Sequence, residues 1–277
     1  MQERIFMFFP HNDMVRERKR NRVFHRLRKN KNELRWTAFV LSFVFFLFFS
    51  WNAFAFNTPE KLVFDLSWGG VKAGTATLEI LHDKGHPKII STARSADWLS
   101  VFYPVDDRTV SVLNNVKGPL VIGLPENYRI KVREGRHRRD KEVIFDHAHR
   151  QATYINHLEN GGKKTYKINE NSLDPLSSFY YIRTLKFEVG KSLYVNMFDS
   201  KKLWDVEVQV LRKEKIRTEL GEFNTVVIKP LMKSEGIFNK KGDLYIWLTD
   251  DVKRIPVKMQ TRVIVGSITA TLAGGTY

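Results

Sequence analysis

Alternation of apolar and polar residues at every second position is the feature that most restricts the fold of this chain. It recurs in residues 62–68, 128–133, 204–210 and 255–263. Because successive side chains of a strand point to opposite faces, this period predicts strands with one buried face and one solvated face. Such strands are typical of antiparallel sheets.

Short polar segments containing Gly, Asn or Asp interrupt these alternating runs. They are "WGG" at 68–70, "DKGHP" at 83–87, "NNVKGP" at 114–119, "ENGGKK" at 159–164, "ELGEF" at 219–223 and "NKKGD" at 239–243. Regular short strands between polar turns predict about ten to twelve strands in a sandwich, barrel or curved roll.

One segment, residues 174–186, departs from the alternation and predicts a short helix. Asp174 can cap the helix and Pro175 suits its first turn. The apolar residues that follow fall on one helical face: Leu176, Phe179 and Tyr180. The predicted fold is therefore mainly β, a curved antiparallel sheet (a β-roll or a half-open barrel) with one short central helix on its concave side. The strands of 60–160 and 190–277 would be two halves of that sheet.

Residues 1–55 have the order of a leader that directs export. A dense basic stretch at 16–35 precedes 36–56, which are 21 residues without a charged side chain and just long enough to span a bilayer as a helix. The basic flank would stay in the cytoplasm. Ala53 and Ala55 suit the −3 and −1 positions of a cleavage site. We expect either a signal peptide cleaved after Ala55 or an anchor retained in the inner membrane.

The exported body, residues 56–277, would then lie in the periplasm as one antiparallel β domain. The net charge of the chain is +16, of which +7 belongs to residues 1–55, so the remainder carries +9. A basic body favours anionic lipid or polysaccharide. Nothing resembles a groove-reading helix or a stacking motif, so no nucleic-acid partner is expected. The basic run at 133–142 is either a solvated hairpin tip or a contact for anionic lipid or lipopolysaccharide.

The sequence offers little support for catalysis. The chain has no cysteine, which excludes disulfides, thiolate metal sites, cysteine nucleophiles and a lipid-modified cysteine. It also lacks the hydrolase motifs Gly-x-Ser-x-Gly and His-Glu-x-x-His and any glycine-rich phosphate loop. We assign no catalytic residue, no metal site and no cofactor. The residues favour a protein that is not an enzyme and leave the question open.

Two polar clusters leave an envelope hydrolase open as an alternative. Asp146, His147 and His149, together with His157, are residue types that bind metals. The same "DHAHRQ" segment is also typical of a polar turn after a strand that ends at Phe145.

The second polar cluster is Asp250 and Asp251, in "TDDVK" between two alternating runs. We interpret them as turn residues, because Asp side chains bond to nearby backbone. Arg254 would pair with one of them across the hairpin.

Aromatic residues are plentiful in the body, and most are expected in the core. Trp98, Phe102, Tyr103 and Tyr181 are among the aromatic residues of the body. A concave sheet face lined with aromatic rings would also suit an apolar ligand. The candidate ligand-binding residues are Trp68, Phe179, Tyr180, Trp204 and Trp247.

Four motifs in order resemble a bacterial family, the domain of unknown function numbered three-one-zero-eight. They are "GVKAGTATLEI" at 70–80, "DPLSSFYYIR" at 174–183, "ELGEFNTVVIKP" at 219–230, and "WLTDDVKRIPVKM" with "GSITATL" at 247–272. The resemblance covers roughly residues 60–273. It implies an exported envelope protein with a curved antiparallel β fold, and it supplies no activity and no site residues. A more distant likeness, in architecture alone, is to lipoprotein carriers such as LolA and LolB.

These observations favour a non-enzymatic protein that binds or carries an apolar or amphipathic envelope component. A lipid, a lipoprotein acyl chain or a glycolipid would fit. The alternatives are a structural component of an envelope assembly and an envelope hydrolase. The sequence leaves the oligomeric state open.

Overall fold

The computed structural model describes residues 59–115, 122–158, 162–199, 201–231, 243–262 and 266–277. These residues belong to one compact unit, Phe54–Tyr277. The leader expected at residues 1–55 lies outside the described ranges and stays a prediction. Within those ranges, no helix is both long enough and apolar enough to cross a membrane.

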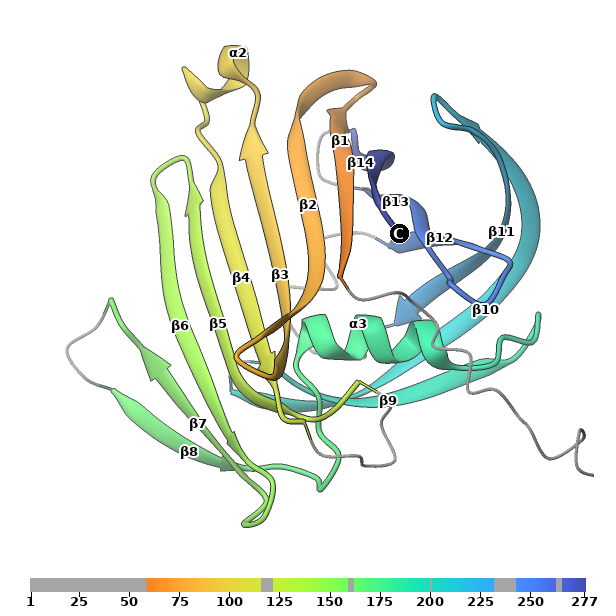
Figure 1. The fold of residues 1–277 in the computed structure, drawn as a ribbon. Helices are drawn as coiled ribbons and strands as arrows, with labels where there is room; N and C mark the ends of the chain where they lie inside the picture. Colours follow the sequence, from red (N-terminus) through yellow and green to blue (C-terminus); the bar gives the residue numbers. More distant parts are fainter. Residues whose placement is uncertain (1–58, 116–121, 159–161, 200, 232–242, 263–265) are drawn as a thin grey trace, which may run out of the picture. The chain divides into compact units, whose positions relative to one another are not determined.

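The described residues form one curved antiparallel sheet of 14 strands (Figure 1). In chain order the strands are β1 (Glu60–Trp68), β2 (Val71–Asp83), β3 (His86–Ser95), β4 (Asp106–Leu113), β5 (Pro125–Glu134), β6 (His137–Asp146), β7 (Gln151–Asn156), β8 (Lys163–Lys167), β9 (Ser192–Asp199), β10 (Lys202–Thr218), β11 (Gly221–Leu231), β12 (Leu244–Thr249), β13 (Pro256–Arg262) and β14 (Ser267–Thr276).

The order of strands in the sheet is β8-β7-β6-β5-β4-β3-β2-β1-β14-β13-β12-β11-β10-β9. The eight strands before the central helix and the six after it are therefore two halves, joined where β1 pairs with β14. This confirms the expected division of one sheet. The estimate of ten to twelve strands was too low. β8, for example, has the sequence "KKTYK" with four of its five residues exposed, so it carries no apolar alternation.

Among the described strands the sheet does not close, because β8 and β9 each pair with one neighbour. Residues 168–174 bridge the two edges. The Ile168 amide donates to the Arg150 carbonyl oxygen at 3.0 Å, and the Phe198 amide donates to the Leu173 carbonyl oxygen at 2.7 Å. The rings of Tyr166 and Phe198 also meet across this gap, with centroids 5.7 Å apart. The edges are thus held together by a connecting segment and by aromatic packing.

The predicted central helix is confirmed as α3 (Pro175–Thr184), which contacts β3 and β4 of one half and β9 of the other. A second helix, α2 (Asp97–Ser100), was not predicted. It is a single turn without a side-chain cap, so it lacks the signals by which α3 is found. In Figure 1, α2 lies at the end of the sheet where β3 turns into β4.

Buried apolar side chains form three clusters, and α3 contributes to each. The first cluster lies on β1 to β4, β13 and β14 and includes Tyr180. The second lies on β9 to β12 and includes Ile182. The third lies on β5 to β7 and includes Phe198 of β9, with Leu176 of α3 packed against it. The helix is therefore the element that joins the apolar contacts of both halves.

Gly74 of β2 shows how closely the strands of the first half approach. A Cβ at this position would lie 2.1 Å from the Arg94 carbonyl oxygen of β3. We predict that Gly74→Ala lowers the free energy of unfolding by roughly 1–3 kcal/mol, because a backbone oxygen cannot move aside cheaply. Urea denaturation checks this. Gly274→Ala is the control, since nothing lies within 4 Å of a Cβ there, and an equal loss in both variants would contradict the steric account.

Candidate functional site

The N-terminus of α3 is fixed by the carboxylate of Asp174, which is completely buried. Its Oδ1 accepts hydrogen bonds from the amides of Leu176 (2.8 Å) and Ser177 (3.1 Å). Its Oδ2 accepts one from the hydroxyl of Ser111 in β4 at 2.5 Å. Burial raises the pKa of Asp174, while these hydrogen bonds oppose the rise. The cap therefore satisfies the open end of the helix and ties it to the first half of the sheet.

The C-terminal turn of α3 is fixed by a buried ion pair. Arg183 donates to both carboxylate oxygens of Glu60 at 2.8 Å, and both side chains are fully buried. The Tyr180 hydroxyl donates to the same carboxylate at 3.2 Å, and Arg183 also donates to the Lys253 carbonyl oxygen at 3.0 Å. Burial and the charge of Glu60 raise the pKa of Tyr180 well above its usual value. The helix is thereby bound to β1 and to the turn before β13.

Between the first and second apolar clusters lie three side chains that are only half-buried, which we call the seam. They are Phe179 and Tyr181 of α3 and Met259 of β13, and each packs against both clusters. The seam is therefore an apolar boundary between the two clusters, and its two residues on α3 are held in place by the anchored ends of that helix. Its chemistry suits an apolar chain, because the three side chains supply ring and thioether surface.

Two of the five predicted ligand residues lie together on α3. Phe179 is half-buried at the seam, and its ring meets that of Tyr180 edge-on with centroids 6.1 Å apart. Tyr180 itself is fully buried in the first cluster beside Glu60. Only Phe179 of these two neighbours therefore keeps part of its ring open to a ligand, because Tyr180 is enclosed by the core.

The other three predicted ligand residues lie on three different strands. Trp204 of β10 is half-buried against the second cluster, with the Lys202 ammonium 4.2 Å from its ring. Trp247 follows Ile246, which faces the second cluster, so Trp247 points to the opposite face of β12. Trp68 ends β1 and is 43% exposed. The structure does not bring the five residues into one site.

The histidines considered as metal ligands make other contacts. Both ring nitrogens of His147 face backbone carbonyl oxygens, that of Glu170 at 3.0 Å and that of Pro125 at 2.9 Å. His149 bonds to Asp146 at 2.7 Å within the turn after β6, which confirms the interpretation of this segment as a turn. Across the described ranges, no group of three or more His, Asp or Glu side chains could hold a metal ion.

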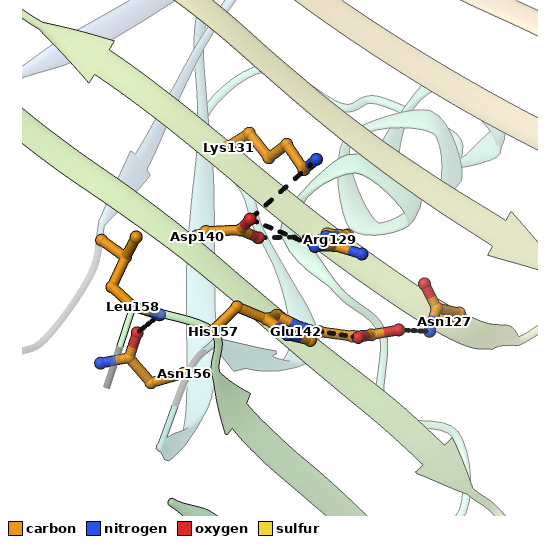
Figure 2. A network of polar contacts seen from close by, with 8 residues as sticks. All are labelled: Asn127, Arg129, Lys131, Asp140, Glu142, Asn156, His157 and Leu158. Carbon is orange, nitrogen blue, oxygen red and sulfur yellow. Dashed lines mark hydrogen bonds and ion pairs between the residues drawn. The ribbon is translucent and has the colours of Figure 1, made fainter. Parts of the chain in front are cut away.

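His157 belongs to a separate polar network on β5 and β6 (Figure 2). Its Nε2 lies 2.7 Å from Glu142, which also accepts a hydrogen bond from Asn127 at 2.6 Å. Beside them Arg129 donates twice to Asp140 at 3.1 Å. Each carboxylate of β6 thus pairs with a polar or basic side chain of a neighbouring segment, and such cross-strand pairs stabilise a sheet.

The adjacent aspartates form a turn, as predicted. Asp251 Oδ1 accepts from the Thr249 hydroxyl at 2.7 Å and from the amides of Lys253 (3.0 Å) and Arg254 (3.1 Å). Asp250 pairs with Lys213 at 2.6 Å and with Arg254 at 3.3 Å, and the Lys213 hydrogen bond is the main cause of its lowered pKa. Both carboxylates hold the hairpin between β12 and β13.

Sequence reasoning missed a group of exposed aromatic residues beside α2. Most of the aromatic residues were expected in the core, without a distinction between individual positions. Trp98, Phe102 and Tyr103 are all exposed, Phe102 by 81%. The residue type alone does not show which aromatic side chains are exposed. The segment "DWLSVFYP" at 97–104 has no strand alternation, and that is the one signal that could have set it apart.

Comparisons with known proteins identify a family and a fold. A family model described as "Protein of unknown function (DUF3108)" matches residues 63–273. No curated protein matched the chain. A crystal structure of a beta-barrel-like DUF1849 protein from Brucella abortus is similar, with a TM-score of 0.51 and 11% identity over 78% of this chain and 96% of that one.

A second solved structure is a protein described as exported, with a YmcC-like fold, from Bacteroides fragilis. It is 11% identical over 80% of this chain and 97% of that one, and its TM-score of 0.31 is too low to carry an argument. The first similarity, at 11% identity, concerns the fold alone.

The buried ion pair yields a sharp test. We predict that Glu60→Gln lowers the free energy of unfolding by about 3–5 kcal/mol, because it leaves the Arg183 guanidinium buried without its counter-charge. Glu79→Gln is the matched control on the neighbouring strand, since its pair with Lys61 is open to solvent on the lysine side and should contribute at most about 1 kcal/mol. Urea denaturation compares the two, and a Glu60→Gln loss as small as that of the control would refute the anchoring role.

Proposed function

The chain belongs to the family described as Protein of unknown function (DUF3108), and we propose that its β-rich body binds an amphipathic component of the cell envelope. Membership confirms the resemblance drawn from the four motifs and leaves the activity to be argued from the structure. The proposed ligand is a lipid, a lipoprotein acyl chain or a glycolipid, whose apolar chain lies along the seam.

The observation that carries the proposal is the seam itself. Phe179, Tyr181 and Met259 each contact two separate clusters of buried residues, yet none of the three is buried. An apolar chain at the seam would remove the remaining exposed surface of these side chains from water, at about 25 cal/mol per Å².

The two fixed ends of α3 also favour ligand binding, because they hold the seam residues of the helix in place. The cap at Asp174 and the pair of Arg183 with Glu60 hold the helix at both ends, so Phe179 and Tyr181 keep their positions without a ligand. Preorganised side chains lose little conformational freedom when a ligand binds. The net charge of +9 outside residues 1–55 favours a ligand with an anionic headgroup.

The proposal also depends on where the body acts. If residues 1–55 direct export, the body is in the periplasm, either released after Ala55 or held at the inner membrane. An envelope amphiphile is then the apolar ligand within reach. Trp68 and Trp204 stay predicted ligand contacts, whereas Tyr180 is fully buried in the first cluster, against which the seam packs.

We predict that the full chain, purified from its own envelope and examined by native mass spectrometry, retains an amphiphile. Met259→Gln, which keeps the length of the side chain but adds an amide to the seam, should lower the retained fraction about tenfold, because burying an unpaired amide is costly. Leu203→Gln is the control, because Leu203 is half-buried against the third cluster and away from the seam.

Three outcomes would count against the proposal. Equal loss of the amphiphile in both variants would exclude the seam as the site. No amphiphile in the wild-type protein, together with a stable protein partner in crosslinking, would favour a structural role in an envelope assembly. Turnover of an ester or glycosidic substrate that depends on Asp250 or His147 would favour a hydrolase.

A further inference from the structure

Six large apolar side chains are exposed on two neighbouring turns at one end of the sheet. We call them the rim patch: Trp68, Val71, Trp98, Val101, Phe102 and Tyr103. Val101 is 77% exposed and Phe102 is 81% exposed, so neither contributes to the core. Isolated exposed apolar residues are ordinary, but a group that includes four aromatic rings marks a contact surface.

The two turns are held together by backbone contacts. The Trp98 indole donates to the Lys72 carbonyl oxygen at 2.9 Å, and the Ala96 amide donates to the Ala73 carbonyl oxygen at 2.8 Å. The base of the α2 loop is closed by the Ser95 amide, which donates to the Val105 carbonyl oxygen at 3.1 Å. The exposed side chains of this loop are therefore presented by an ordered backbone.

A basic hairpin adjoins the rim patch. The Gly135 amide, in the turn between β5 and β6, donates to the Pro104 carbonyl oxygen at 2.8 Å, and the Tyr103 ring lies where a Cβ on Gly135 would meet it at 2.8 Å. Residues 133–139, the basic hairpin, contain four arginines and one glutamate. Arg133, Arg136 and Arg138 are exposed. In Figure 1 the β5–β6 turn and α2 lie at the same end of the sheet.

We propose that the rim patch and the basic hairpin dock the body onto the surface of a bilayer that contains anionic phospholipid. Aromatic side chains are favoured at the boundary between headgroups and acyl chains, where their rings are partly wet. Arginines beside them meet the phosphates of the headgroups with planar, charge-assisted hydrogen bonds. The combination of apolar insertion and positive charge is what interfacial binding requires.

Charge decides between a bilayer and a second copy of the chain. In a symmetric dimer through this face, the four arginines of one copy would lie close to the four of the other. The carboxylates of Glu134, Asp97 and Asp107 are fewer than the four arginines, and Asp107 already accepts a hydrogen bond from the Arg133 amide at 2.9 Å. Asp106 is paired with Arg94 at 3.3 Å. An anionic lipid surface presents many phosphate groups that can pair with these arginines, so it fits the basic hairpin better than a second copy of the chain does.

This inference is independent of the proposed ligand. The rim patch and the seam share no residue, so docking can fail while binding at the seam holds, and the reverse. Trp68, which belongs to the rim patch and is also a predicted ligand contact, is changed in neither test. Together they would bring the body to the membrane surface from which an amphiphile is taken or to which it is delivered.

Absence of cysteine from the chain allows a site-specific test in the full-length protein. A spin label is attached at Phe102→Cys in one sample and at Leu220→Cys, an exposed position in the β10–β11 turn, in another. Each protein is reconstituted with vesicles of phosphatidylcholine alone or with added phosphatidylglycerol. The leader is present in every sample, so differences between labels report on the body.

We predict that the label at position 102 becomes accessible to oxygen and protected from a water-soluble relaxing agent only with phosphatidylglycerol. The label at position 220 should stay in water. Replacing two arginines together, Arg136→Gln and Arg138→Gln, should lower the ratio of immersed to water-exposed label by about fivefold per arginine. The control pair, Lys215→Gln and Arg217→Gln, removes the same charge from exposed positions on β10 and should leave the ratio unchanged.

Docking on lipid would be refuted if the label at position 102 stayed as water-accessible as the label at position 220. Equal immersion in neutral and anionic vesicles would refute the role of the basic hairpin. Immobilisation of the label at position 102 without vesicles would show that the rim patch contacts protein, either a second copy or another chain, in place of lipid.

Discussion

The buried pair of Arg183 with Glu60 is the interaction on which the described structure most depends. It joins the last turn of α3 to the first strand of the sheet, across 123 positions of sequence. Removing both charges from water costs free energy that their attraction only partly recovers. The pair therefore fixes the position of α3 on the sheet more clearly than it adds to the net stability of the fold. Tyr180 and the Lys253 carbonyl complete the hydrogen bonds around it, and the helix is thereby fixed between the two halves of the sheet.

Because α3 is fixed at both ends, the seam has a defined position on the sheet, separate from the rim patch. The helix fills part of the concave side with its own buried residues and leaves the seam half-buried. The rim patch lies at the strand ends, on turns that the core does not need. A protein built in this way would separate two tasks, with membrane contact assigned to the turns and ligand contact assigned to the helix.

Local signals in the sequence account for what could be predicted. α3 follows from Asp174 and Pro175, whose effects on the backbone need no tertiary partner, and the alternating strands follow from one-sided burial. The partner of Arg183 could not be predicted, because the pairing spans two distant elements. The rim patch was missed because the type of an apolar residue such as Phe102 does not show whether its side chain is buried or exposed.

Native-state hydrogen exchange tests the central claim, that the buried pair of Arg183 with Glu60 anchors α3 to the sheet. If the pair does so, the helix and the sheet open as one unit. Amides of α3 and of β1 in the full chain should exchange only through the same global opening, with equal free energies and equal dependence on denaturant. Fast exchange of α3 through a local opening, while β1 stays protected, would contradict the claim and show that the helix merely rests on a sheet that is stable without it.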